Sequence, residues 1–99
     1  MITGKQRAAL RRMSNSLDTI YQVGKGGFSP ELIKGLSDAL EARELVKLRV
    51  LENSGMTTRS VADALAGELS CEIVSVVGGC IVIYRRSSIE KNRKIELPK

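Results

Sequence analysis

Residues 19–40 have the sequence TIYQVGKGGFSPELIKGLSDAL and combine two kinds of secondary structure with a loop between them. The first five residues are mostly β-branched or aromatic, which favours a strand. Glycines interrupt this run, and Ser29 and Pro30 then supply the cap and the first position typical of a helix. Leu32 and Leu36 follow at helical spacing. The stretch therefore predicts a strand, a glycine loop and an amphipathic helix in direct succession.

The residues before this unit predict another helix. Thr3 and Gln6 have the spacing of a capping box, in which each side chain satisfies a backbone N–H group of the other residue. Apolar residues from Leu10 to Leu17 recur on one helical face, and arginines and lysines occupy the remaining arc. We expect this helix to end near residues 15–16, with an apolar stripe and a basic back.

The residues after the unit return to the pattern of a strand. Between residues 44 and 51, apolar and basic side chains alternate with a period of two. Thr57 or Thr58 would cap a third helix. Residues 72–84 then have the pattern of a β-hairpin that turns at residues 78–79, both of which are glycine.

The predicted order of elements is α-β-α-β-α-β-β. Helices that separate strands imply parallel pairing through crossovers, and the closing hairpin adds an antiparallel pair. We therefore expect an α/β protein with a mixed four-stranded sheet and helices packed against it. The length of 99 residues fits a single domain spanning residues 1–99, with a basic tail at about residues 86–99.

The composition offers little for catalysis or metal binding. The chain has no histidine, the commonest metal ligand and general base near neutral pH. Cys71 and Cys80 match no metal-binding spacing, and the hairpin would place them too far apart for a disulfide. We expect no enzyme activity, catalytic residue, metal, cofactor or small-molecule substrate. No apolar run reaches the length of a membrane span and the first residues lack a signal-peptide pattern, so we expect a cytoplasmic protein without membrane contact.

The net charge of +5 is unevenly distributed. Residues 1–30 carry five basic side chains and one acidic, and residues 73–99 carry six basic and two acidic. Residues 31–72 between them carry five basic and eight acidic. A folded chain could therefore present one positive face to a polyanion, although charges of this number also occur simply as solvated surface.

The loop Gly24-Lys25-Gly26-Gly27 has the form GxxG and joins the predicted strand to the helix. Glycines let a ligand approach the backbone, and the following helix start offers N–H groups to a phosphate. Loops of this form clamp the nucleic-acid backbone in KH-type modules. A tight turn that needs a positive φ explains the same glycines equally well. The loop matches neither the Walker A nor the dinucleotide-binding motif.

Basic side chains in other elements could support such a clamp. Only three aromatic residues are present, so a stacking platform for bases is not expected, and contacts to the backbone of structured RNA fit better. The candidate RNA-binding residues are Gly24, Lys25, Gly26 and Gly27, supported by Arg7, Arg11, Arg12, Lys47, Arg49 and Arg85.

Residues 23–33, VGKGGFSPELI, and 39–51, ALEARELVKLRVL, resemble the CRM-domain family, named for chloroplast RNA splicing and ribosome maturation. The start ITGKQR at residues 2–7 and the ending IVIYR at 81–85, followed by KIELP at 94–98, also match in order. The resemblance covers essentially the whole chain. One departure is Cys80 after the hairpin glycine, where the family often has a basic residue.

The resemblance implies a fold similar to the C-terminal domain of translation initiation factor three, with a KH-like GxxG loop, and RNA binding without catalysis. Stand-alone bacterial members, the YhbY-like proteins, are associated with precursors of the large ribosomal subunit. We therefore expect a monomeric ribosome assembly factor that binds ribosomal RNA. The alternative is a protein–protein adaptor whose basic surface docks on ribosomal or regulatory proteins.

Overall fold

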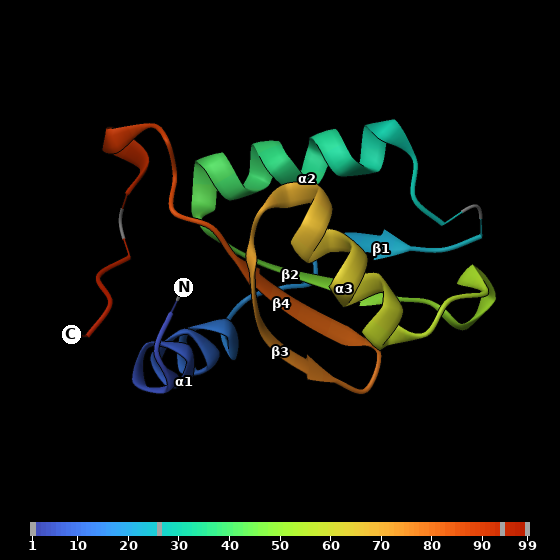
Figure 1. Ribbon diagram of the computed structural model, residues 1–99, viewed down its shortest axis with the longest axis horizontal. Helices are drawn as coiled ribbons and strands as arrows, with labels where there is room; N and C mark the ends of the chain where they lie inside the picture. Colours follow the sequence, from blue (N-terminus) through green and yellow to red (C-terminus); the bar gives the residue numbers. More distant parts are fainter. Residues whose placement is uncertain (1, 26, 94, 99) are drawn as a thin grey trace.

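The computed structural model describes residues 2–25, 27–93 and 95–98. Within these residues the predicted order of helices and strands is confirmed (Figure 1). Two 3₁₀ turns, η1 and η2, were not predicted from the sequence. The helices are α1 (Gly4–Ser14), α2 (Pro30–Arg43) and α3 (Thr58–Leu69); the strands are β1 (Tyr21–Val23), β2 (Leu45–Val50), β3 (Glu72–Val77) and β4 (Cys80–Tyr84); the turns are η1 (Glu52–Ser54) and η2 (Glu90–Asn92).

The helix starts follow the predicted capping chemistry. Thr3 Oγ1 accepts a hydrogen bond from the Gln6 backbone N–H at 3.1 Å, and the Gln6 side chain accepts one from the Thr3 N–H at 2.9 Å. Ser29 and Thr57 each accept a hydrogen bond from the backbone N–H three residues later. Each cap satisfies an N–H group that would otherwise lack a partner in the first helical turn.

The four strands form one mixed sheet in the order β1-β2-β4-β3. β1 and β2 are parallel, whereas β4 is antiparallel to both β2 and β3. The hairpin prediction is confirmed, since Gly78 has a φ of +59° and Val77 pairs with Cys80. The second helical crossover does not produce a parallel neighbour, because β4 lies between β2 and β3.

Helices cover both faces of the sheet, and the core has two parts. On one face, α2 and α3 pack over a large cluster that includes the fully buried Leu36, Leu65 and Ile81. On the other face, α1 packs over a smaller cluster that includes Leu10 and Val82. Full burial of one such aliphatic side chain stabilises the fold by roughly 1.5–3 kcal/mol, so the larger cluster supplies most of the hydrophobic stabilisation.

Some local predictions need correction. β1 begins at Tyr21 rather than Thr19, and β2 begins at Leu45 rather than Glu44. Glu44 instead ends α2 with a φ of +65°, and its side chain is 1% exposed. Met13 was predicted in the apolar stripe of the first helix but is 37% exposed, because the cluster under α1 centres on Leu10.

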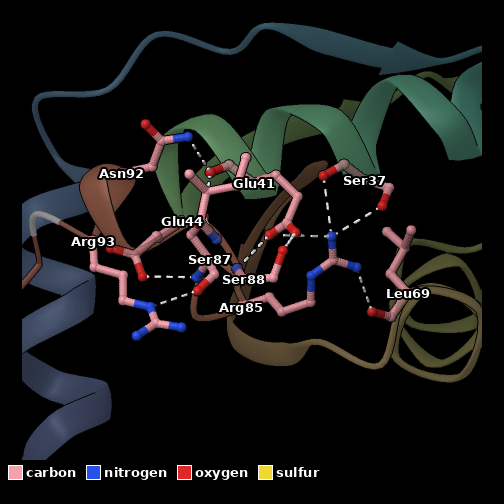
Figure 2. A network of polar contacts seen from close by, with 10 residues as sticks. Ser37, Glu41, Glu44, Leu69, Arg85, Ser87, Ser88, Asn92 and Arg93 are labelled. Carbon is pink, nitrogen blue, oxygen red and sulfur yellow. Dashed lines mark hydrogen bonds and ion pairs between the residues drawn. The ribbon is translucent and has the colours of Figure 1, made fainter.

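The basic tail packs along the end of α2 (Figure 2). The Ser87 backbone N–H donates to Glu44 Oε2 at 2.9 Å, and Ser87 Oγ donates to the Glu41 carbonyl at 2.6 Å. Arg93 Nε donates to the Ser87 carbonyl at 2.7 Å, and the Ile95 N–H donates to Glu44 Oε1 at 3.3 Å. The buried Glu44 carboxylate therefore serves as an acceptor that orders the chain after β4.

Candidate nucleic-acid interface

The GxxG loop lies at the end of the sheet where β1 stops (Figure 1). The Gly27 N–H donates to the Gly24 carbonyl at 3.0 Å and closes a four-residue turn. Gly27 has a φ of +62°, a conformation that glycine adopts without steric cost. Lys25 is exposed, and Gly26 lies outside the described residues. The turn thus favours glycine at Gly27, whether or not a ligand binds there.

The loop after β2 supports this turn from one side. The Leu51 N–H donates to the Val23 carbonyl at 2.8 Å, which joins the two loops where the parallel strands end. A Cβ atom at Gly24 would lie 3.4 Å from Leu51 Cδ1, and one at Gly27 would lie 3.5 Å from Met56 Sδ. Both are ordinary van der Waals distances, so backbone conformation rather than crowding limits substitution at Gly27.

A row of side chains extends from the GxxG loop across the face of the sheet that carries α1. Strand register pairs Gln22 with Arg49, Arg49 with Cys80, and Cys80 with Val77. Lys47 is two residues before Arg49 and therefore points to the same face. Gln22, Arg49 and Val77 are exposed, so α1 leaves this half of the sheet open.

Two of the three predicted arginines on α1, Arg7 and Arg11, lie beside the open half of the sheet, near β3. Arg7 and Arg11 are four residues apart and so share one side of the helix. Together with Arg59 they line a depression of about 330 Å³ along β3, next to Ser75 and Val77. The structure therefore brings Arg7, Arg11, Lys47 and Arg49 to one face of the sheet.

Arg59 was missed by sequence reasoning. It stands in the first turn of α3 and reaches the edge of the sheet at β3. Its positive charge did not stand out in the sequence, because Arg59 lies within residues 31–72, where acidic side chains outnumber basic ones.

Two other predicted residues lie elsewhere. Arg12 is exposed but is five residues from Arg7, which places it on another side of α1. Arg85 is part of the polar network in Figure 2: Nη1 donates to the Leu69 carbonyl at 2.8 Å, and Nη2 donates to the Ser37 carbonyl at 3.1 Å and to Ser37 Oγ at 2.9 Å. Glu41 lies 4.0 Å from the same nitrogen. These protein acceptors occupy Arg85, so we remove it from the set of phosphate contacts.

The aromatic side chains pack against the core and form no shared platform. Tyr21 and Phe28 pack on the larger cluster. Tyr84 belongs to the smaller cluster, is 7% exposed, and has a raised pKa because burial disfavours its charged form. Because the aromatic rings offer no platform for stacked bases, a nucleic acid would be bound through its charged sugar-phosphate backbone.

The two cysteines are free thiols, in agreement with the prediction that they form no disulfide. Burial raises the pKa of Cys71 to about 11, so its reactive thiolate form is scarce at neutral pH. Across the described ranges, no three Cys, Asp or Glu side chains are grouped as metal ligands would be. None of the described helices is both long enough and apolar enough to span a bilayer.

Comparison with known proteins identifies the family. The model of the CRS1/YhbY (CRM) domain matches residues 2–85. The chain belongs to the CRM-domain family. The relative named Probable RNA-binding protein YqeI, from Bacillus subtilis, is 44% identical over 98 residues, which cover 99% of this chain and all of the relative.

Two further matches extend over nearly the whole CRM domain. A Haemophilus influenzae relative named RNA-binding protein is 26% identical over 98 residues, which cover 99% of this chain and 96% of the relative. The solution structure of SAV1595 from Staphylococcus aureus has a TM-score of 0.77 and 40% sequence identity, and the match covers 99% of this chain and 100% of that one. The α/β fold described above is therefore shared with this solved structure.

Proposed function

We propose that the protein binds RNA through a surface, called here the basic face, that runs from the GxxG loop across the open half of the sheet to α1. The observation that carries the proposal is the strand register, which puts Lys47 and Arg49 on the same side as α1. This face comprises Lys25, Gly24, Gly27, Lys47, Arg49, Arg7, Arg11 and Arg59; Gly26, by its place in the motif, is proposed to belong to it as well.

Phosphate contacts are the mode of binding that this face supports. Its basic side chains come from separate elements and spread over one side of the molecule, as neutralisation of a polyanion requires. The GxxG turn leads within two residues to the capped start of α2, where the helix dipole favours negative charge. The names of the Bacillus subtilis and Haemophilus influenzae relatives lend support, because both state RNA binding.

The RNA that we propose is ribosomal RNA in precursors of the large subunit. This step rests on the resemblance to stand-alone bacterial members of the family. It is supported by the Bacillus subtilis relative, because the match covers 99% of this chain and all of that protein. In this role the protein acts as a cytoplasmic monomer without catalysis, cofactor or small-molecule substrate.

The salt dependence of RNA affinity tests the proposed mode. Each neutralised phosphate contributes about −0.7 to −0.9 to the slope of log affinity against log salt. Reversal of two charges, Lys47→Glu with Arg49→Glu, should weaken RNA binding and reduce the slope by roughly two phosphates' worth. Arg86→Glu with Lys91→Glu is the matched control, because it reverses the same number of charges at two exposed residues that follow the far end of β4. Equal effects of the variant and the control would contradict a localised basic face.

Crosslinking in cells, followed by sequencing of the bound RNA, tests the proposed partner. We expect enrichment of large-subunit ribosomal RNA. Enrichment of messenger RNA would overturn the assembly role and leave RNA binding intact. Co-sedimentation with ribosomal particles that survives RNase digestion would instead favour the protein–protein adaptor.

A further inference from the structure

A groove between α2 and α3 begins where the GxxG loop ends. It has a volume of about 680 Å³, within the ~300–1,000 Å³ typical of sites for small ligands. Phe28, the residue directly after Gly27, lines its loop end, and Arg85 lines it together with Leu69 near the end of α3. Ile33 on α2 and Ala64 on α3 add apolar surface. The groove lies on the face of the sheet opposite the basic face, and both meet at the GxxG loop.

Arg85 presents a fixed, flat cation to this groove. Its hydrogen bonds to Ser37 on α2 and to the Leu69 carbonyl on α3 lie in the plane of the guanidinium and hold it in one orientation. The side chain is 23% exposed. Three of the five guanidinium N–H groups already donate to Leu69 and Ser37, which leaves a phosphate only part of the in-plane fork. A planar ring can instead stack on the guanidinium face.

The charged side chains that line the groove include two carboxylates. Asp38 and Glu68 are exposed there, and Lys34 is the other charged residue beside Arg85. Carboxylates repel phosphates and accept hydrogen bonds from N–H donors. The groove therefore suits a neutral, planar group that carries amino hydrogens, and it does not suit the RNA backbone.

We propose that this groove holds one unpaired base with an exocyclic amino group, that is adenine, cytosine or guanine rather than uracil. The inference rests on the proposed function, because the base belongs to the strand whose backbone crosses the GxxG loop. Continuity supports this occupant, since the loop and the groove share the chain at Gly27–Phe28. Phosphates lie on the basic face and the loop, and the base enters between α2 and α3.

Oligo(C) and oligo(U) of equal length provide the test. Cytosine and uracil have similar size and weak self-stacking, but cytosine carries an amino donor where uracil carries a carbonyl acceptor. By fluorescence anisotropy at low salt, we expect oligo(C) to bind roughly tenfold more tightly, the effect of one hydrogen bond to a charged group. Ala64→Phe fills the groove and should reduce oligo(C) affinity to that of oligo(U). Ala42→Phe, an exposed position on α2 outside the groove, should leave the preference unchanged.

The outcomes separate this inference from the proposed function. Equal affinities of the wild type for oligo(C) and oligo(U) would overturn the base site and leave RNA binding standing. Absence of binding to either oligonucleotide would also overturn the base site, and only absence of binding to ribosomal RNA as well would overturn the proposed function. If Ala64→Phe does not fold, the double variant Asp38→Ala with Glu68→Ala replaces it, because both side chains are exposed. Retention of the oligo(C) preference in that variant would also contradict the proposal.

Discussion

Gly27 combines a left-handed backbone with a place at the edge of the basic face. Replacement by Asn or by Asp adds the same bulk at a φ of +62°, so we expect both variants to lose about 1 kcal/mol of folding stability or less. Only Asp adds a negative charge where phosphate should lie. RNA affinity, measured by anisotropy, should therefore fall much further in Gly27→Asp than in Gly27→Asn.

Lys25→Ala completes the series at the loop. It removes one exposed charge and keeps the backbone path, so its effect on affinity should be smaller than that of Gly27→Asp. Circular dichroism and denaturation would verify that each variant is folded. If a folded Gly27→Asp protein binds RNA as well as Gly27→Asn does, the glycines serve only the turn.

The two cysteines should differ in reactivity. Cys71 is buried and its pKa is raised to about 11 from 9.0, so at neutral pH it holds about 100-fold less thiolate than an ordinary cysteine. Cys80 is half-buried in the row beside Arg49. We expect iodoacetamide to label Cys80 first, as resolved by peptide mass spectrometry. Earlier labelling of Cys71 would mean that α3 and β3 separate readily in solution.

At the scale of elements, Arg85 links α2 to the end of α3. Arg85→Ala would leave the Ser37 and Leu69 acceptors without their donors, so we expect a loss of roughly 1–3 kcal/mol in the free energy of unfolding. Arg85→Lys should recover only part of this, because an ammonium cannot reach both helices with a planar fork. Urea denaturation measures the loss. If Arg85→Ala leaves the stability unchanged and reduces the slope of log RNA affinity against log salt, Arg85 contacts phosphate after all.

The elements that depend on local chemistry were predictable. The Thr3, Ser29 and Thr57 caps and the hairpin glycines act on neighbours in sequence, so their signals survive without knowledge of the fold. Glu44 shows where such reasoning fails. It directly precedes the alternating residues of β2 and was assigned to that strand, but the chain uses it to end α2 and to accept hydrogen bonds from residues more than forty positions later.

Predictability of the site follows the same division. Alternation along β2 was enough to put Lys47 and Arg49 on one polar face. Placement of Arg59 and Arg85 required knowledge of which elements become neighbours, because one extends to β3 and the other lies between two helices. Charge and motif therefore predicted the GxxG loop and the polar face of β2 as candidates, and tertiary contacts show which arginines lie on the same face of the sheet.

For the molecule as a whole, acid should loosen the attachment of the tail. The pKa of Glu41 is lowered, chiefly by hydrogen bonds from the Ser88 hydroxyl and backbone N–H, with a smaller contribution from the Arg85 charge. A carboxyl group whose pKa is lowered in the folded state stabilises the fold when the pH is above the ordinary pKa of that group. This contribution is lost as the pH falls through the folded-state pKa. The free energy of unfolding should thus decrease on acidification, and less steeply in Glu41→Gln. Identical pH dependence of the two proteins would show that Glu41 does not anchor the tail.

The position of β4 in the sheet also has a consequence for synthesis. β4 is the last strand in the chain, yet it lies between β2 and β3 and pairs with both. A nascent chain that has emerged only to residue 77 has two facing strand edges with nothing between them. Pairings that connect such distant segments form late in folding. The ribosome must therefore expose the chain beyond residue 84 before the sheet can close, and release of a shorter fragment leaves two open edges that favour aggregation.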